Sequence, residues 1–333
     1  MTERRRDPLT GEWRMFASHR QDRTFLPPDE YCPLCPSRPG GLPTEIPLPH
    51  FDVVVFENRF PSLVREPPPP EVVGSELYPV APSVGANEVV VYSDDHTLTL
   101  ADMKVERVAR LVAVWAERYA DLGAREEGAY VFIFENRGVA VGVTLHHPHG
   151  QIYAYPEIPP RPRLELETAA AHLERHGTCV LCDVVGRERA DGIRVVGHNR
   201  SFLAFVPFAA RFPYEVHIVS QRHAASLLDL TDPERLALAE MLQAVAAGYD
   251  RLFGFPLPYI MSMHQAPTDD GQHQAISHLH LELTPLHRSA DRLKYLAGSE
   301  LGAGAFINDT APEATAMRLR AAIGEVGAGH FAR

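Results

Sequence analysis

An internal duplication is the feature of this chain that most constrains its fold. The segment NEVVVYSDDHTLTLADM (87–103) resembles YEVHIVSQRHAASLLDL (214–230), an alignment that pairs Glu88 with Glu215 and His96 with His223. Further blocks recur in the same order: two CxxC pairs, FENRFPSL (56–63) with GHNRSFLA (197–204), YVFIFENRG (130–138) with YIMSMHQAP (259–267), and HPHGQI (147–152) with HLHLEL (278–283). A repeated series of this kind predicts two copies of one structural unit.

Each copy is predicted to contain four strands and one long helix. The predicted strands lie near 51–56, 88–92, 130–135 and 147–155 in the first copy, and near 202–206, 215–219, 259–264 and 278–284 in the second. Apolar spacing predicts a helix from Val105 through Tyr119, and Asp232-Pro233-Glu234 is a good helix start for its counterpart. The proline-rich stretches 65–74 and 156–163 are interpreted as connectors, the second between the halves. The pattern indicates an α+β fold with antiparallel sheets.

The composition limits the classes of partner. Hydrophobic residues make up 45% of the 333 and charged residues 23%, as in a soluble globular protein. A net charge of −11 argues against nucleic acid as a partner, so a phosphate-bearing ligand would need local donors. No apolar run approaches the ~18–20 residues of a membrane span, and MTERRRDPLTGEW has no apolar signal-peptide core. We therefore expect a cytoplasmic protein without a membrane partner.

The four cysteines fall as two CxxC pairs, Cys32 with Cys35 and Cys179 with Cys182. Disulfides are not expected in a large chain without an export signal. A CxxC brings two thiolates to one turn, and structural zinc takes four tetrahedral nitrogen or sulfur ligands. The first copy offers such a set in Cys32, Cys35, His96 and His147. The alternative is a pair of reduced, buried cysteines.

His149 requires an interpretation of its own. It stands two residues beyond His147, so both side chains would share one face of an extended strand. A neutral imidazole can act as a covalent nucleophile when its other nitrogen donates to a backbone carbonyl. Gln151 on the same face can donate to a phosphoryl oxygen. Spacing alone leaves a second interpretation equally open, in which His149 is a further metal ligand or an ordinary strand histidine.

These residues resemble the galactose-1-phosphate uridylyltransferase family, a branch of the histidine-triad superfamily. The matching blocks are SHRQDR, CPLC, FENRFPSL, ENRGVAVGVTLHHPHGQIYAYP, MHQAP and KYLAGSELGAGAFIND, and they span nearly the whole chain. The resemblance implies two tandem histidine-triad-like units, each an antiparallel half-barrel sheet with a long helix. We expect an N-terminal unit at 1–165 with the nucleophile and a zinc site. A C-terminal unit at 166–333 would carry a second metal site and a hexose-phosphate block.

The resemblance also implies a ping-pong transfer of UMP. His149 would attack the α-phosphorus of UDP-glucose, release glucose 1-phosphate and carry UMP until galactose 1-phosphate removes it as UDP-galactose. His147 would be a zinc ligand together with Cys32, Cys35 and His96. A homodimer is implied as well, because Arg20 and Arg23 match basic residues that reach the nucleotide phosphates across a dimer interface.

Further site residues follow by matching motif positions to the family. Those expected around the uridine and phosphates are Asn58, Asn136, Gly142, Thr144 and Gln151, and those expected near the hexose are Lys294 and Glu300. Arg59 stands where many members have Asp, which leaves recognition of the ribose or base open.

Two ligand sets compete for a second metal, zinc or iron, in the C-terminal half. The repeat favours the set Cys179, Cys182, His223 and His278, the images of the first-copy set. The resemblance offers instead the set Glu165, His264, His278 and His280. Both sets need His278, so they cannot both be complete. We favour the cysteine set because two thiolates beside two histidines form the better zinc environment.

Two other functions are compatible with parts of the sequence. A sibling activity would use the same His149 with inorganic phosphate as acceptor, giving a nucleoside-diphosphate-sugar or dinucleotide phosphorylase. A zinc-stapled binding module without enzymatic activity is a more distant alternative, and the acidic balance counts against one that binds RNA.

Overall fold

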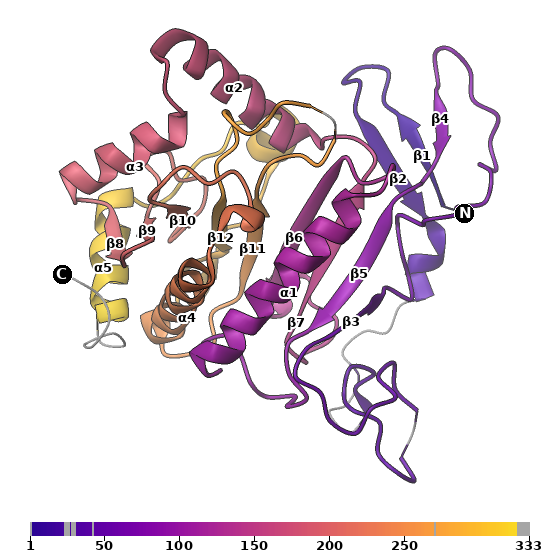
Figure 1. Ribbon diagram of the computed structural model, residues 1–333, viewed down its shortest axis with the longest axis horizontal. Helices are drawn as coiled ribbons and strands as arrows, with labels where there is room; N and C mark the ends of the chain where they lie inside the picture. The colour runs from indigo at the N-terminus through magenta and orange to yellow at the C-terminus, as the bar shows by residue number, and fades with distance from the viewer. Residues whose placement is uncertain (1, 23–26, 28–30, 42, 270, 325–333) are drawn as a thin grey trace.

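The computed structural model describes residues 2–22, 27, 31–41, 43–269 and 271–324. Its central element is an antiparallel sheet of nine strands in the order β3-β5-β7-β6-β11-β12-β10-β9-β8 (Figure 1). The strands are β3 (Val54–Glu57), β5 (Ala86–Val91), β6 (Tyr130–Arg137), β7 (His149–Tyr155), β8 (Val195–His198), β9 (Phe202–Phe205), β10 (Val216–Ser220), β11 (Tyr259–His264) and β12 (His280–Pro285). All eight predicted strands overlap one of these, and β8 is additional.

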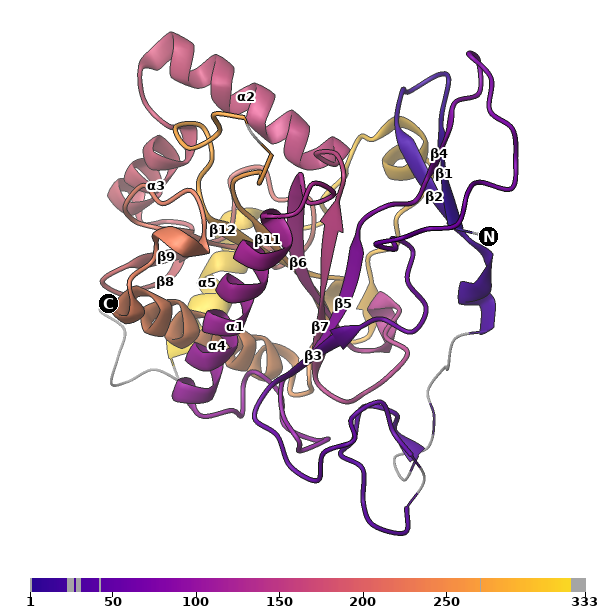
Figure 2. The same ribbon diagram turned by 45° about the vertical axis from the view of Figure 1, so that its right-hand side comes forward.

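Two long helices cover one face of this sheet. Helix α1 (Val105–Gly123) and helix α4 (Asp232–Phe253) contact each other and lie side by side in both ribbon views (Figures 1 and 2). The buried stripe of α1 includes Val108, Val112 and Trp115, as its apolar spacing predicts. A capping box between Thr231 and Glu234 starts α4. The main hydrophobic core therefore lies between these helices and the sheet.

The proline-rich stretch 156–163 is not a plain connector. Helix α2 (Pro160–His176) begins inside it, with Pro160 and Pro162 in the first turn. Proline is tolerated there because the first amides of a helix have no partner within the helix. The predicted unit boundary after residue 165 falls inside α2 and stays a prediction. Two other helices had no sequence prediction, namely α3 (Val180–Asp191) and α5 (Pro312–Gly324).

Smaller elements surround the main sheet. A three-stranded sheet contains β1 (Thr2–Arg6), β2 (Trp13–Ala17) and β4 (Val80–Pro82), and a two-stranded one contains β13 (His287–Ser289) and β14 (Arg292–Leu293). The short helical turns are η1 (Ser18–Asp22), η3 (Val139–Val141), η4 (Leu227–Asp229) and η5 (Gly298–Gly302). No helix in the described ranges is long and apolar enough to cross a membrane.

The strand register reveals a pseudo-two-fold axis between the two copies. Gln151 lies opposite Phe134, and Glu282 lies opposite Ser262, so Phe134 and Ser262 occupy equivalent places. Phe134 is also the direct partner of Ser262 where β6 pairs with β11. A residue that pairs with its own image lies on the symmetry axis, so the axis passes between these two strands. The half-sheets are therefore joined edge to edge into one sheet.

The sequence alignment of the copies is wrong by one residue in this region. Glu88 lies opposite Ile152, and it is Val216 that lies opposite Leu283, the image of Ile152. A shift of one residue sends a strand side chain to the other face. Glu88 indeed faces α1, where it pairs with Arg118, whereas Glu215 lies on the opposite face beside His217.

A second correction concerns the block that contains Asn58. Strand β3 pairs with β5 as β9 pairs with β10, so β9 occupies the place of β3. Asn58 follows β3, but Asn199 precedes β9, in the turn after β8. The similarity between FENRFPSL and GHNRSFLA therefore does not mark equivalent positions.

The buried ion pair between Glu88 and Arg118 should contribute strongly to stability. Arg118 donates to both carboxylate oxygens of Glu88 at 2.8 and 2.7 Å, and the Glu88 side chain is 4% exposed. Replacing Arg118 with Met would leave a buried carboxylate without this partner, which costs roughly 3 kcal/mol. We expect Arg118→Met to lower the free energy of unfolding in urea by about that amount.

The same helix provides a control. Arg110 pairs with Asp52 at 2.7 Å, but both side chains are about half exposed, at 54% and 49%. Arg110→Met should cost less than about 1 kcal/mol. Equal losses in the two variants would contradict the importance assigned to the buried pair.

Candidate active site

The candidate nucleophile lies at the start of β7, on the face of the sheet opposite α1. Alternation along the strand directs His149, Gln151 and Tyr153 to one face, and Ile152 to the core. Gly150 between them is required by packing, because a Cβ atom there would lie 2.2 Å from the hydroxyl of Tyr92. The strand begins at His149, so the alternation does not extend back to His147.

The structure brings most of the predicted substrate residues to one cavity of about 220 Å³. Seven of them line it: Arg20, Asn58, Asn136, Gly142, Thr144, His149 and Gln151. Apolar side chains that sequence reasoning did not single out form much of the remaining wall, among them Leu34, Phe56, Val89 and Phe134. A cavity with an apolar wall and several convergent polar groups is typical of a small-molecule site.

His149 has the hydrogen bond that a nucleophilic imidazole needs. Its Nδ1 lies 2.7 Å from the carbonyl oxygen of His147, so Nδ1–H donates and Nε2 keeps its lone pair. Burial lowers the pKa of His149, which favours the neutral ring. The arrangement supports covalent attack by Nε2 on an electrophile in the cavity.

Two arginines line the same cavity. Arg20 donates from Nη1 to the carbonyl oxygen of Phe60 at 3.0 Å, which holds its positive charge at this cavity. Arg59 also lines the cavity and pairs with Glu45 at 3.1 Å. Arg23 lies outside the described residues.

Lys294 and Glu300 are not among the described residues that line the cavity of His149. They pair with each other at 3.0 Å, and both are buried. The ammonium of Lys294 lowers the pKa of Glu300 to about 2. The pair holds the segment that includes η5 in place.

The first cysteine group assembles as predicted. One ligand atom each from Cys32, Cys35, His96 and His147 lies within 4.8 Å of the others. The Sγ atom of Cys35 is 3.4 Å from Nδ1 of His96 and 3.5 Å from Nδ1 of His147. His147 donates from Nε2 to the carbonyl oxygen of Ser93 at 2.7 Å, so its Nδ1 is left to act as a ligand.

The second cysteine group repeats this arrangement with Cys179, Cys182, His223 and His278. Sγ of Cys182 is 3.6 Å from Nδ1 of both His223 and His278. Each imidazole again donates from Nε2 to a backbone carbonyl, at 2.8 Å in both cases. His278 is therefore oriented toward the thiols, as the repeat predicts.

Both groups have dimensions that suit a tetrahedral zinc ion. Bonds of about 2.3 Å to sulfur and about 2.0–2.1 Å to nitrogen place the two ligand atoms roughly 3.5 Å apart. The measured sulfur–nitrogen distances of 3.4–3.6 Å agree. Burial lowers the pKa of both His147 and His278 to about 4, which keeps these rings neutral and able to bind a metal.

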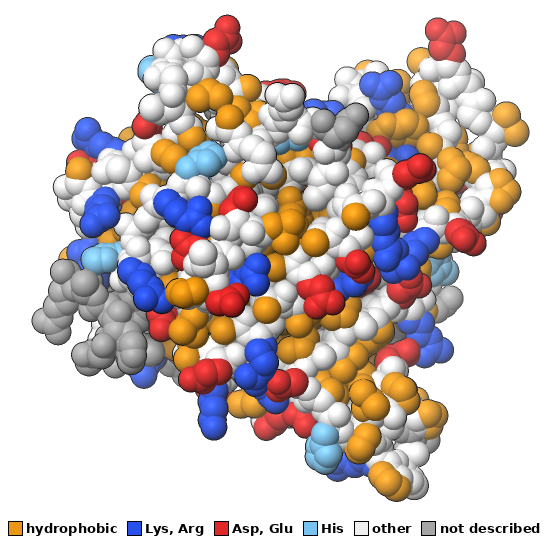
Figure 3. Space-filling view, viewed as in Figure 1, with side chains coloured by type: hydrophobic (Ala, Val, Ile, Leu, Met, Phe, Trp, Pro, Cys, Tyr) orange, Lys and Arg blue, Asp and Glu red, His pale blue; other side chains and the backbone are white. Residues whose placement is uncertain are grey.

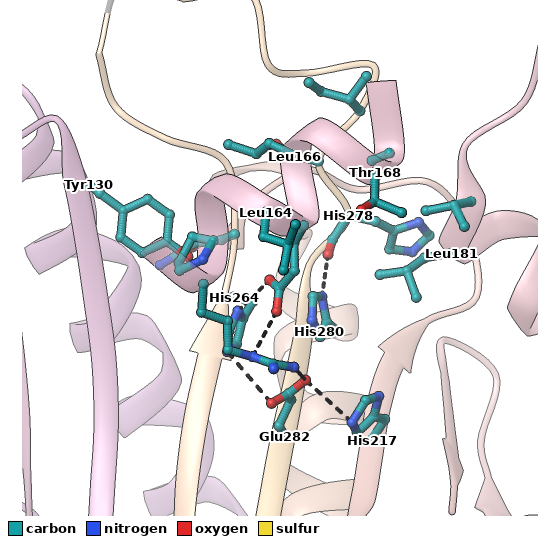
Figure 4. A pocket seen from close by; sticks show the side chains of 18 residues that line it. Tyr130, Leu164, Leu166, Thr168, Leu181, His217, His264, His278, His280 and Glu282 are labelled. Carbon is teal, nitrogen blue, oxygen red and sulfur yellow. Dashed lines mark hydrogen bonds and ion pairs between the residues drawn. The ribbon is translucent and has the colours of Figure 1, made fainter. Parts of the chain in front are cut away.

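A second cavity, of about 360 Å³, lies between α2 and the C-terminal half of the sheet (Figure 4). By the strand register, His280 and Glu282 occupy in it the places of His149 and Gln151. His280 also repeats the hydrogen bond of the nucleophile, since its Nδ1 lies 2.8 Å from the carbonyl oxygen of His278.

The four residues of the alternative metal set, Glu165, His264, His278 and His280, all line this second cavity. Glu165, His264 and His280 form a group of their own, in which Nδ1 of His264 is 2.8 Å from Glu165. His278 lines the cavity but is bonded within the cysteine group. His217 also lies here, with its Nε2 3.4 Å from Glu282. His217 was missed by the sequence analysis because its alignment of the two copies was one residue out of register.

Glu135 is a buried acid on the core face of β6. Its neighbours Phe134 and Asn136 face the cavity of His149, whereas Glu135 is 6% exposed and accepts a hydrogen bond from the Tyr259 hydroxyl at 3.4 Å. Burial raises the pKa of Glu135 to about 7. About half of these carboxyl groups therefore keep their proton at pH 7, where an exposed glutamate is ionised.

Two family models match the chain. The one described as "Galactose-1-phosphate uridyl transferase, N-terminal domain" matches residues 1–159, and its C-terminal counterpart matches residues 165–332. The galactose-1-phosphate uridylyltransferase of Thermotoga maritima is 41% identical over 96% of this chain and 98% of its own length. The enzyme of that name from Streptomyces lividans is 37% identical over 96% of this chain and 86% of its own.

Solved structures show the same similarity. A structure described as a uridylyltransferase covers 98% of this chain and 99% of its own, with a TM-score of 0.85 and 37% identity. An ADP-glucose phosphorylase from Arabidopsis thaliana has a TM-score of 0.73 at 24% identity, covers 96% of this chain and 98% of its own, and shares the fold.

The raised pKa of Glu135 should make stability depend on pH. The folded-state pKa of about 7 lies above the usual 4.5, so the unfolded chain loses this proton first as the pH rises. Stability should therefore fall between about pH 4.5 and 7. Glu135→Gln, which keeps an acceptor for Tyr259, should be more stable than the wild type by about 1–3 kcal/mol at pH 8 and nearly equal at pH 4.5.

Urea unfolding at several pH values measures this difference. Glu117→Gln, on the exposed face of α1, is the control and should show no such trend. A difference between Glu135→Gln and the wild type that is constant with pH would contradict the prediction.

Proposed function

Since the chain belongs to the galactose-1-phosphate uridylyltransferase family, we propose that it transfers UMP in two steps through a covalent uridylyl group on His149. The enzyme is a nucleotidyltransferase of galactose metabolism, a UDP-glucose–hexose-1-phosphate uridylyltransferase. UDP-glucose and galactose 1-phosphate are its substrates, and UDP-galactose and glucose 1-phosphate are its products.

In the first step, Nε2 of His149 forms a bond to the α-phosphorus of UDP-glucose. The bond from that phosphorus to the bridging oxygen breaks, and its electron pair leaves with glucose 1-phosphate. The imidazole gains positive charge, which the carbonyl oxygen of His147 stabilises through the 2.7 Å hydrogen bond to Nδ1–H. This hydrogen bond is the observation that carries the assignment of His149.

In the second step, a phosphate oxygen of galactose 1-phosphate attacks the same phosphorus and releases the neutral imidazole. Gln151 would donate to a phosphoryl oxygen in both steps, and the positive charge of Arg20 would offset the phosphate charge. Asn58, Asn136, Gly142 and Thr144 would contact the nucleotide. The apolar wall, including Leu34 and Val89, would receive the uracil ring.

The covalent intermediate can be trapped. Incubation with UDP-glucose labelled at the α-phosphorus should place acid-labile label on the protein, and galactose 1-phosphate should discharge it. His149→Ala should acquire no label, because His149 is the only histidine among the described residues that line the cavity. His146→Ala is the matched control and should label normally, since His146 is exposed and outside that cavity.

Two outcomes would contradict this function. Equal labelling of His149→Ala and the wild type would show that the nucleophile is another residue. Discharge by inorganic phosphate but not by galactose 1-phosphate would favour a phosphorylase.

Zinc is the proposed occupant of both cysteine groups. Support comes from the two thiolates in each group, the sulfur–nitrogen distances of 3.4–3.6 Å, and the backbone carbonyls that fix the imidazoles. Bound zinc would supply a structural cross-link between each CxxC turn and the strands beside it. Lys294 and Glu300 are proposed to lie near the hexose of the bound substrate, although neither is among the described residues that line the cavity of His149.

Metal analysis tests the zinc sites. We expect two zinc ions per chain, with Cys32→Ser and Cys179→Ser each losing a different one, as measured by elemental analysis after dialysis. One zinc and one iron per chain, both retained in Cys179→Ser, would contradict zinc binding at the second group.

A cytoplasmic homodimer is the proposed form of the enzyme. Exposed apolar side chains precede β4 in the chain, where Val73, Leu77 and Tyr78 are 99%, 62% and 61% exposed. Figure 3 shows hydrophobic side chains at the surface in its upper right, the region of β4 in Figure 1. A surface of this kind supports a contact between protein chains.

A further inference from the structure

The orientation of the Gln151 carboxamide is determined by its surroundings. A carboxamide has an oxygen that accepts and an amine that donates, and the two ends have nearly the same shape. Only the hydrogen-bond partners decide which end faces the reacting phosphoryl group. The proposed function needs the donating end there, so the direction of this side chain matters for catalysis.

The direction is fixed first by a backbone amide. The N–H of Phe60, which can only donate, lies 2.9 Å from Oδ1 of Asn58. This bond leaves Nδ2 as the free end of Asn58, and Nδ2 donates to Oε1 of Gln151 at 3.4 Å. The Phe60 N–H thus determines which end of the Asn58 carboxamide accepts, and Asn58 in turn determines which end of the Gln151 carboxamide accepts.

Tyr153 supplies a second donor to the same oxygen. Its hydroxyl lies 3.3 Å from Oε1 of Gln151, and the residue as a whole is buried. The ring packs edge to face against Phe134, with centroids 5.0 Å apart and planes at 78°. Two donors therefore converge on Oε1, and Nε2 is the end of Gln151 that remains for a ligand in the cavity shared with His149.

We propose that Asn58 and Tyr153 are positioning residues that hold Gln151 with its Nε2 available to the phosphoryl group. This inference rests on the proposed function, in which that group moves to and from His149. With the opposite orientation, Oε1 would meet a phosphoryl oxygen, and two acceptors would face each other. With the observed orientation, Nε2 gives a charge-assisted hydrogen bond to an oxygen that gains charge in the transition state.

The pseudo-symmetric cavity lacks this arrangement. His280 has the same hydrogen bond to a carbonyl as His149, but Glu282 stands in the place of Gln151. Glu282 accepts from Arg161 at 3.0 Å and from Arg211 at 2.8 Å, and an ionised carboxylate has nothing to donate. The two cavities therefore have the same histidine arrangement and differ in the neighbouring side chain, which can donate a hydrogen bond only in the cavity of His149.

Tyr153→Phe tests the proposal because it removes only the hydroxyl. Loss of one of the two donors should lower the rate of His149 labelling and the kcat of the full reaction by about tenfold, with little change in KM for UDP-glucose. Tyr155→Phe, two residues further along β7 and not among the residues that line this cavity, is the matched control and should keep the wild-type rate.

A double-mutant cycle separates positioning from a merely structural role. In a Gln151→Ala background, Tyr153→Phe should have no further effect on kcat, because the side chain it orients is gone. Gln151→Glu, which can accept from both donors but cannot donate, should be as impaired as Gln151→Ala. The same tenfold loss in both backgrounds would overturn the proposal, as would a wild-type rate in Tyr153→Phe.

These outcomes are distinct from a failure of the proposed function. If the wild type never acquires label from UDP-glucose, the covalent mechanism fails. If the wild type labels on His149 and Tyr153→Phe labels at the same rate, the mechanism stands and only the positioning role is wrong.

Discussion

Strand β6 pairs with strand β11 along five residue pairs, and this one antiparallel ladder joins the two copies into a single sheet. Because Phe134 pairs with its own image, Ser262, the copies are related by an axis that passes through this residue pair. Helices α1 and α4 consequently lie on the same face and share one hydrophobic core. The opposite face is left for both cavities, one on each side of the axis.

The two cavities show how the same backbone supports different chemistry. Both contain a histidine whose Nδ1–H donates to a carbonyl two residues earlier in the chain. In the first cavity, the neighbouring Gln151 is directed by donors and stays open to a ligand. In the second, Glu282 is surrounded by Arg161, Arg211 and His217, so its interactions are satisfied within the protein. Side-chain identity at one position therefore changes a donor site into an internal ion network.

The two cysteine groups are built from local and distant parts of the chain. Each CxxC supplies two sulfur atoms from one turn, while its histidines come from the segments after β5 or β10 and before β7 or β12. His147 belongs to the cysteine group and His149 lines the cavity although they are two residues apart, because β7 begins at His149. The first residue of β7, His149, thus adjoins the first cysteine group, and zinc bound there would hold this end of the strand.

The sequence by itself determined the duplication, the main strands, the two long helices, both CxxC pairs and the HPHGQ motif. These features depend on short-range spacing, in which period, turn chemistry and ligand type can be read from neighbouring residues. The sequence did not determine the strand register. When two strand segments are aligned without knowledge of their partners, a shift of one residue is not evident. The match of Glu88 to Glu215 is wrong for that reason. The sequence also did not indicate α2, because prolines at a helix start resemble those of a linker. Only the tertiary structure decided that His278 joins the thiols and that Gln151 directs Nε2 to its cavity, because both depend on which groups from distant segments surround the side chain.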